Sequence, residues 1–340
     1  MVGEIPFIDY QSFHSSDERA LVRLAGQVAH ACEEIGFFYA VNHGIPGELI
    51  ERAFTAARRF FALPLEQKMA LALNQRHMGY LPIGAAVQAA STVRKAIRPN
   101  QNESFFVSYD RDSDHPEAAR SNSLGGRNQW PADLPRLRAD MMAYFGAVSA
   151  MCRRMLPSFA VALGMTADFF APFFAGDPHA NLRFLHYPPK GMTEDNADGQ
   201  RAHTDNSFIT ALARTDVPGL LARLPSGEWV APSVIPGTFL IYLGNIMRRW
   251  SNDRFLSAPH RVLNQPQVDR YSIAFFFSPN PDSVIECLPS CISTENPAHY
   301  RPAVYRDLIL DFHRENSFRQ KNDHSEASSS ATALEHCSHL

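Results

Sequence analysis

The sequence predicts a mainly β protein with α-helices, built as a two-sheet sandwich or barrel and preceded by a helical layer from the N-terminal part of the chain. Two observations support this fold class. Between Asn181 and Cys287, short runs rich in β-branched and aromatic residues alternate with turns that contain proline or glycine. Before this stretch, apolar residues recur at three- and four-residue steps over longer segments, which is typical of amphipathic helices.

Two helices are expected near the N-terminus. Ser15 and Glu18 fit a capping box, apolar residues then follow at helical spacing, and Gly36 supplies a plausible C-terminal cap. The second helix runs from Gly47 to Ala62 and is stopped by Pro64.

Strands, loops and one long helix complete this region. We expect strands at Glu4 to Ile8, Phe37 to Asn42 and Phe105 to Tyr109, loops at 74–100 and 110–130, and a helix from about Leu134 to Leu163 that contains Pro157. Together these elements form an N-terminal helical and mixed region, residues 1–165, packed on the core.

The core, residues 166–320, should consist of short strands closed by one helix. The strands are expected at Leu182 to Tyr187, His203 to Ala213, Leu220 to Arg223, Phe239 to Leu243, Arg261 to Asn264 and Arg270 to Ser278, and the helix at Tyr305 to Glu315. Residues 321–340, with three consecutive serines and scattered charges, are expected to form a disordered tail.

Composition excludes several classes of function. Hydrophobic residues make up 45% of the chain and charged residues 20%, enough for a large buried core. The formal net charge of −3 gives no basic footprint for nucleic acid, and no apolar stretch is long enough to span a bilayer.

The five cysteines include no Cys-x-x-Cys pair, and the N-terminus lacks a signal-peptide pattern, so we expect a cytoplasmic protein with reduced thiols. Cys287 and Cys291 have no further soft ligands nearby in sequence, and their role stays open.

Three residues form a candidate metal site. His203 and Asp205 are two residues apart in a predicted strand, so their side chains would point to the same side. His260 lies at the edge of a later predicted strand, after a stretch long enough to return to the same cavity. Two imidazoles and one carboxylate can hold one face of an iron(II) ion and leave the other face open, where a 2-oxo acid and dioxygen can bind.

A second pair suits the far end of such a co-substrate. Arg270 can meet a distal carboxylate with a two-pronged hydrogen bond, and Ser272, on the same face of its strand, can donate a hydroxyl. Ala274 and Phe276 continue this face, so the pocket wall would change from polar to apolar.

These motifs together resemble the isopenicillin N synthase-like branch of the iron(II)/2-oxoglutarate-dependent dioxygenases. The resemblance spans most of the chain, through Ile5 to Asp9, Gly36 to Tyr39, Asn42 to Ile45, Leu185 to Pro189, His203 to Asp205, His260 to Val262 and Arg270 to Ser272. It implies a double-stranded β-helix, or jelly roll, as the core fold.

The resemblance also assigns residues. His203, Asp205 and His260 match the iron ligands, and Arg270, Ser272 and Tyr187 match the binding site of 2-oxoglutarate. Phe276 falls where relatives present an aromatic ring to the organic substrate, and Phe105 lies in a strand that relatives place near the pocket. One departure concerns Leu185-His186-Tyr187, where many plant relatives have Asn-Tyr-Tyr and use the asparagine on the co-substrate.

The implied enzyme uses Fe(II), 2-oxoglutarate and O2 to hydroxylate, desaturate or cyclise a small-molecule metabolite, with release of succinate and CO2. Two alternatives remain open from the residues. One is an iron(II) oxidase or cyclase that takes its electrons from the substrate, and the other is a non-catalytic metal- or ligand-binding protein on a jelly-roll scaffold. The substrate, the outcome of the oxidation and the oligomeric state do not follow from the sequence.

Overall fold

The structure is a computed structural model of the chain, and it describes residues 5–11, 18–86, 99–112, 114–120, 124–189, 198–265 and 267–315. The predicted capping residue Ser15, part of the predicted loop at 74–100 and the predicted tail at 321–340 lie outside this described part.

The largest element is an eight-stranded sheet with the order β1-β2-β10-β7-β12-β5-β4-β3. Its strands are β1 (Phe7–Asp9), β2 (Phe37–Val41), β3 (Gly79–Leu81), β4 (Glu103–Ser108), β5 (Ala180–Tyr187), β7 (Ile209–Arg214), β10 (Phe239–Leu243) and β12 (Arg270–Phe277). Strands of the predicted N-terminal region, β1 to β4, thus lie in the same sheet as strands of the predicted core.

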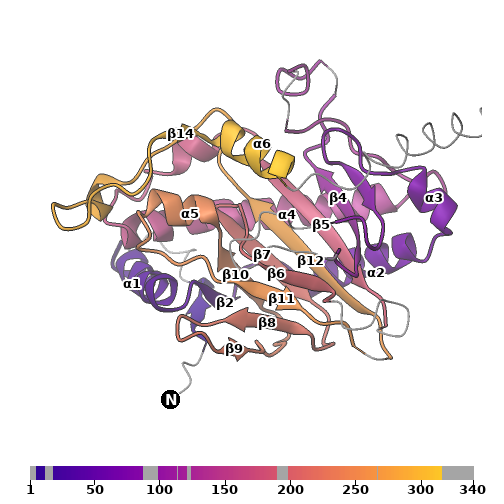
Figure 1. Ribbon diagram of the computed structural model, residues 1–340, viewed down its shortest axis with the longest axis horizontal. Helices are drawn as coiled ribbons and strands as arrows, with labels where there is room; N and C mark the ends of the chain where they lie inside the picture. Colours follow the sequence, from indigo (N-terminus) through magenta and orange to yellow (C-terminus); the bar gives the residue numbers. More distant parts are fainter. Residues whose placement is uncertain are drawn as a thin grey trace, which may run out of the picture.

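A smaller sheet faces one side of the large one (Figure 1). It has the order β6-β11-β8-β9, with β6 (Gln200–His203), β8 (Leu220–Arg223), β9 (Trp229–Val230) and β11 (His260–Val262). A separate pair joins β13 (Val284–Ile285) to β14 (Ala303–Val304). Two sheets that enclose an interior between them form the two-sheet arrangement predicted from the sequence.

Helices cover the opposite side of the large sheet and its ends (Figure 1). They are α1 (Glu18–Glu34), α2 (Gly47–Phe61), α3 (Leu65–Met69), α4 (Leu137–Ala162), α5 (Asn245–Trp250) and α6 (Tyr305–Glu315), with 3-10 helices at Ala171–Phe174 and Pro289–Cys291. Of these, α1 and α2 both pack against α4, and α2 and α4 reach β12.

Strand alternation divides the large sheet between a core face and a site face. On β12, Ile273, Phe275 and Phe277 belong to the main hydrophobic core that the helices cover. Arg270, Ser272 and Ala274 of the same strand point to the other side, into the space between the sheets. The helices therefore stabilise the fold on one face, and the opposite face is free to hold a site.

The single strand expected from His203 to Ala213 is wrong. The chain leaves the small sheet after His203, passes through residues 204–208 without strand structure, and joins the large sheet as β7 at Ile209. Strand β7 is buried on both faces, and the run Asp-Asn-Ser at 205–207 is turn-forming, so the prediction of one continuous strand overlooked a local loop signal. Asp205 consequently lies beyond the end of β6, and simple strand alternation does not place it.

Other boundaries differ by a few residues. The first strand is Phe7–Asp9 rather than Glu4 to Ile8, and the strand around Phe105 starts at Glu103. Several short elements, α3, α5, β3, β9, β13 and β14, were not expected, because a segment of a few residues can be predicted only where its composition is distinct.

Candidate metal centre and active site

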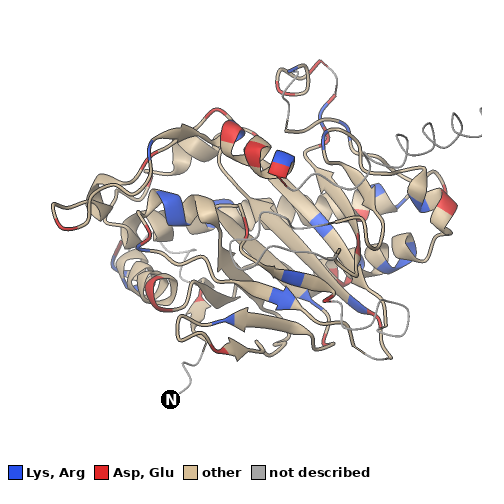
Figure 2. Cartoon of the chain, viewed as in Figure 1, with Lys and Arg blue, Asp and Glu red and all other residues tan. Residues whose placement is uncertain are grey.

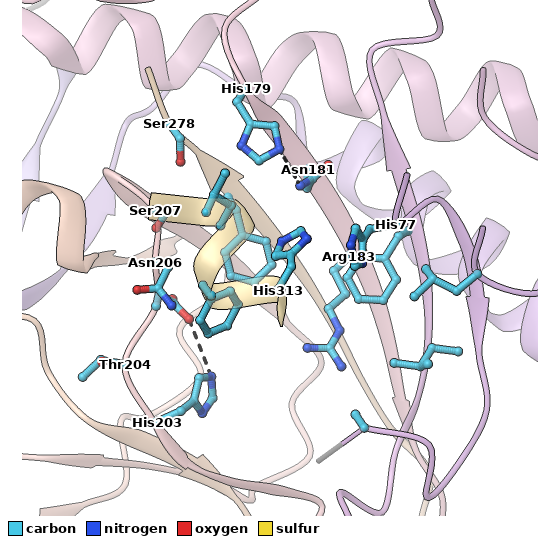
Figure 3. A pocket seen from close by; sticks show the side chains of 18 of the residues that line it. His77, His179, Asn181, Arg183, His203, Thr204, Asn206, Ser207, Ser278 and His313 are labelled. Carbon is cyan, nitrogen blue, oxygen red and sulfur yellow. Dashed lines mark hydrogen bonds and ion pairs between the residues drawn. The ribbon is translucent and has the colours of Figure 1, made fainter. Parts of the chain in front are cut away.

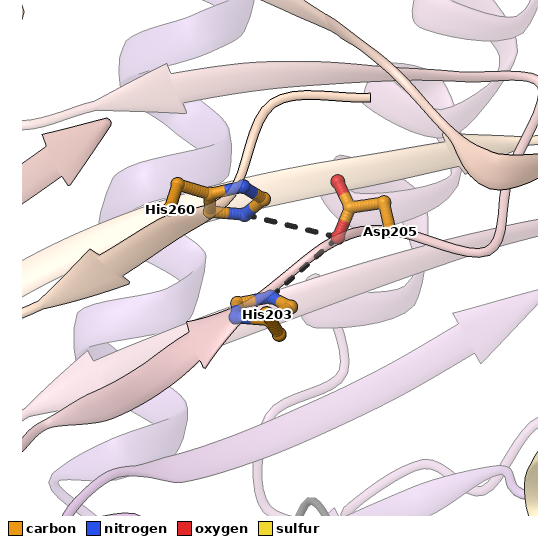
Figure 4. Close-up of side chains that lie close together, drawn as sticks. All are labelled: His203, Asp205 and His260. Carbon is orange, nitrogen blue, oxygen red and sulfur yellow. Dashed lines mark ion pairs between the residues drawn. The ribbon is translucent and has the colours of Figure 1, made fainter. Parts of the chain in front are cut away.

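Three ligand-bearing side chains converge between the sheets (Figure 4). His203 Nε2 lies 3.6 Å from Asp205 Oδ1, and His260 Nε2 lies 3.8 Å from the same oxygen. All three candidate ligand atoms lie within 4.8 Å of one another. Within the described residues, no other group of three or more histidine, cysteine or acidic side chains has this arrangement.

Each ligand comes from a different structural context. His203 ends β6 and faces His260, its direct partner at the start of the neighbouring strand β11. Asp205 is placed by the connection from β6 to β7, whose backbone is held by the start of α5: Asn245 N donates to Asp205 O at 2.7 Å. The side chain of Asn245 also donates to Thr204 Oγ1 and Asn206 Oδ1 on either side of the aspartate.

Backbone carbonyls orient both imidazoles. His203 Nδ1 lies 2.7 Å from Arg201 O, and His260 Nδ1 lies 3.2 Å from Ala258 O. A carbonyl can only accept, so each Nδ1 carries a proton, and Nε2 is the nitrogen that faces the centre of the site.

Burial and neighbouring charges keep His260 and Asp205 in the protonation states that bind a metal. Burial, together with the neighbouring His203, lowers the pKa of His260 to about 4, so this imidazole is neutral at neutral pH. Burial alone would raise the pKa of Asp205, but the nearby His260 and His203 outweigh it and lower the pKa to about 2. The carboxylate is therefore ionised.

The residues fit a divalent cation. Asp205 Oδ2 is buried and has no hydrogen-bond partner in the described structure, which is costly unless something else neutralises it. Two imidazoles and one carboxylate form the set of donors that suits iron(II) with coordination positions left open.

A buried arginine lies in the cavity next to this centre. Arg270 is only 1% exposed, and its Nε and Nη1 have no partner within the described residues. Tyr187 is its cross-strand neighbour on β5, with the guanidinium carbon 4.8 Å from the ring centroid. Ser272, the metal-site residues and Phe276 line the same cavity, so the structure brings together the residues proposed for the metal and for the co-substrate.

A second cavity also reaches the metal site, and Figure 3 shows the side chains that line it. Phe276, His203 and Asp205 line both cavities, so the second one reaches the same centre. Its outer wall includes Ile309, Phe312 and His313 of helix α6, and His313 packs edge-on against His77 at 3.8 Å between ring centroids.

Phe105 does not belong to either cavity, and the expectation that it contacts substrate is wrong. It is fully buried in the main core, 4.1 Å from Phe60 between ring centroids, on the face of β4 that the helices cover. Its neighbour Phe106 points the other way and lines the second cavity. The sequence placed the correct strand near the cavity, but a buried aromatic pair gives no sign of which ring faces the site.

Sequence reasoning also missed residues that complete the site. Arg183 and Gln200 line both cavities, and Asn245 supports the aspartate loop. Alternation on β5 places Arg183 on the same face as Tyr187, a signal that could have identified it. Asn245 has no comparable signal, because its role depends on a contact with a distant loop.

Comparison with known proteins agrees with this geometry. Residues 5–133 match the family described as "non-haem dioxygenase in morphine synthesis N-terminal", and residues 178–279 match the "2OG-Fe(II) oxygenase superfamily". The 2-oxoglutarate-Fe(II) type oxidoreductase hxnY of Emericella nidulans is 38% identical over 89% of this chain and 88% of its own length. The chain therefore belongs to the 2-oxoglutarate/iron(II)-dependent oxygenase family, and it is an enzyme of this class.

Particular relatives and solved structures extend the comparison. Azadirone synthase LFS of Melia azedarach is 35% identical over 81% of this chain and 83% of its own length. A full-length Neurospora crassa protein, crystallised in complex with alpha-KG and 5-formyluracil, superposes with a TM-score of 0.77 at 28% identity, covering 92% of this chain and 96% of that one. A putative 2OG-Fe(II) oxygenase family protein of Caulobacter crescentus gives a TM-score of 0.79 at 27% identity, covering 92% and 99%.

These findings confirm the predicted fold class, a jelly-roll core with a helical layer, and the predicted cofactors and co-substrates, Fe(II), 2-oxoglutarate and O2. The enzyme oxidises a small molecule. No helix in the described ranges combines the length and the apolar character that a membrane crossing needs. Figure 2 shows basic and acidic residues interspersed along the described chain in this view.

Proposed function

We propose that His203, Asp205 and His260 bind the iron, that Arg270, Ser272 and Tyr187 hold the distal carboxylate of 2-oxoglutarate, and that the second cavity admits the organic substrate beside Phe276. One observation carries this proposal. The three candidate ligands and Arg270, whose Nε and Nη1 have no partner among the described residues, line a single cavity between the two sheets.

The protein residues bind, orient and exclude water, while the bound iron supplies the oxygen-dependent chemistry. Arg270 compensates the distal carboxylate in a site with little water, where a charge-assisted pair is strong. The apolar residues of the second cavity, among them Leu81 and Phe312, hold the substrate so that one C–H bond faces the metal. Hydroxylation is the proposed default outcome, with desaturation or ring closure as alternatives.

The proteins that this chain resembles differ in what they act on or bind. Solved structures of the Neurospora crassa protein contain thymine or 5-formyluracil. A homoarginine-6-hydroxylase of Oryza sativa is 28% identical over 86% of this chain. These names do not fix one substrate class, and we propose that the substrate is a small, partly apolar metabolite. We also propose that the protein has no nucleic acid or membrane partner. We also retain the cytoplasm as the proposed location, a proposal supported by the four buried free thiols of the described residues.

Succinate formation tests the proposal. Purified protein supplied with Fe(II), O2 and 2-oxoglutarate is screened against a broad set of metabolites, with the Asp205→Ala variant as a matched control. We expect substrate-stimulated succinate that needs both iron and 2-oxoglutarate and that disappears in the variant. Succinate formation that Asp205→Ala leaves intact would contradict the assigned ligand set. Substrate oxidation that persists without 2-oxoglutarate would instead favour the oxidase or cyclase alternative.

A further inference from the structure

Arg183 is a buried cation at the junction of the two cavities. It lies on β5, two residues before Leu185, and lines both the co-substrate cavity and the substrate cavity. Only 9% of the residue is exposed. Figure 3 shows its guanidinium pointing into the cavity from this strand. The proposed roles of iron and 2-oxoglutarate make no use of this group.

Neutral groups position one side of the guanidinium. Its Nε donates to Ser104 Oγ at 2.9 Å, and its Nη2 lies 3.4 Å from Asn102 Oδ1. The ring of Phe106 lies alongside, 4.9 Å from the guanidinium carbon. The opposite residue on β12 is Ala274, whose small side chain leaves room for the long arginine. The guanidinium is thus held in place by partners that carry no charge.

No carboxylate forms an ion pair with Arg183. Within the described part of the chain, none lies at ion-pair distance from it, and its Nη1 has no hydrogen-bond partner. Among the described residues that line the substrate cavity, Asp205 is the one acidic residue, and it faces the metal. Burial lowers the pKa of Arg183, but an arginine keeps its proton under these conditions.

When iron and 2-oxoglutarate are bound, Arg183 is the one charged group counted in the site without an opposite charge to balance it. The two positive charges of iron and the one of Arg270 are cancelled by Asp205 and the two carboxylates of 2-oxoglutarate. Arg183 is then the uncompensated charge, and because its side chain is largely buried, this charge is costly until an anion pairs with it. The free Nη1 edge of a guanidinium matches the two oxygens of a carboxylate.

We propose that Arg183 binds an anionic group, most simply a carboxylate, on the organic substrate, and that this enzyme therefore acts on a small acid. This inference rests on the proposed function of the two cavities. The acid group lies on Arg183, and the apolar body of the substrate extends along Phe276 and Phe106 toward α6. Because Arg183 lies beside the metal ligands, the oxidised carbon is one near the carboxylate.

Direct binding tests the proposal without turnover. Anaerobic protein loaded with Fe(II) and 2-oxoglutarate is titrated by calorimetry with acids and their isosteric amides: benzoate and benzamide, phenylacetate and phenylacetamide, 3-phenylpropionate and its amide. We expect at least one acid to bind roughly 10-fold or more tightly than its amide, and Arg183→Gln to remove this preference. Arg183→Lys should retain part of it, because the charge remains.

Two control measurements separate a role of Arg183 in substrate binding from a general effect of charge or of co-substrate binding. Arg52→Gln removes a positive charge from a surface ion pair with Asp140 on the helical side and should leave the preference unchanged. The affinity for 2-oxoglutarate, read from the iron–2-oxoglutarate absorption band, should change less than about threefold in Arg183→Gln. If the band itself fails to form in the parent protein, the proposed function fails rather than the role of Arg183.

The proposal is overturned if acids and amides bind equally, if amides alone bind, or if no acid of the series binds. It is also overturned if Arg183→Gln weakens 2-oxoglutarate while the preference for acids persists, since Arg183 would then serve the co-substrate.

Discussion

Arg270 illustrates how a single residue can be tested for its role. Its guanidinium is fully buried, with Nε and Nη1 unpartnered among the described residues, and Ser272 and Tyr187 line the same cavity. In Arg270→Lys the charge remains but the two-pronged geometry is lost. We expect the KM for 2-oxoglutarate to rise roughly 10- to 100-fold with little change in iron affinity. Steady-state succinate assays and a metal titration measure the two effects.

The outcome that would contradict this role is a parallel loss of iron and 2-oxoglutarate binding, because that would indicate a general collapse of the cavity. Ser272→Ala provides a milder comparison. It removes one neutral hydroxyl and should raise the KM by less than the arginine change.

At the residue scale, chemistry-bearing side chains were predictable and packing residues were not. His203, Asp205, His260 and Arg270 could be recognised because few other functions explain these residue types in this order. Phe105 was misassigned because its phenyl ring is equally suited to the core and to a cavity, and only the register of β4 decides between them. Arg183 was overlooked because its importance depends on the lack of an ion-pairing carboxylate among the described residues.

At the element scale, the start of α5 supports the metal site. Asn245 binds the loop around Asp205 through both its backbone and its side chain. Replacing Asn245 by alanine removes the two side-chain bonds and lets the aspartate move. We expect iron affinity to fall roughly 10-fold, as for other residues that orient metal ligands. Calorimetric titration with Mn(II), which avoids oxidation, measures the change.

Asn280→Ala is the matched control, because Asn280 contacts Pro172 O and lines neither cavity. Equal metal affinity in Asn245→Ala and in the unaltered protein would show that the backbone bond alone holds the loop.

Gly244, which precedes α5, gives a steric test of the contact between this helix and the Asp205 loop. A Cβ at this position would lie 2.0 Å from Ser207 O, a backbone atom of the Asp205 loop that cannot rotate away. Gly244→Ala should therefore displace the loop, lower the free energy of unfolding by about 1–3 kcal/mol and weaken iron binding. Gly146→Ala in α4 should instead stabilise the protein by about 0.5–1 kcal/mol, since a Cβ there meets nothing within 4 Å.

Chemical denaturation with and without Mn(II) compares the two variants. A Gly244→Ala protein as stable as Gly146→Ala would mean that the loop has another acceptable position.

Element prediction succeeded where a pattern was long or compositionally distinct. The expected spans at Leu220–Arg223, Phe239–Leu243 and Tyr305–Glu315 agree with β8, β10 and α6. It failed between β6 and β7, where the turn-forming residues 205–207 mark a crossing from the small sheet to the large one that was taken for continuous strand. This crossing is what brings Asp205 to His260, so the error falls at the site itself. The spacing suggested that His203 and Asp205 lie close together, but the loop between β6 and β7, rather than strand alternation, places the aspartate.

At the scale of the whole molecule, metal and co-substrate should stabilise the fold together. Both proposed sites lie between the two sheets, and neither exists once the sheets separate, so each ligand should favour the folded state. Mn(II) at about one hundred times its dissociation constant should add about 2.7 kcal/mol to the free energy of unfolding. The Tm should rise by several degrees in thermal unfolding followed by circular dichroism.

The two ligands should also be coupled. If 2-oxoglutarate binds the metal at one end and Arg270 at the other, as we propose, it should raise the Tm much more with Mn(II) present than without it. Asp205→Ala should abolish the response to Mn(II) and most of the response to 2-oxoglutarate. Arg270→Lys should keep the response to Mn(II) alone. If 2-oxoglutarate raised the Tm equally with and without metal, the arginine pocket would bind it independently, and the two halves of the cavity would not act as one site.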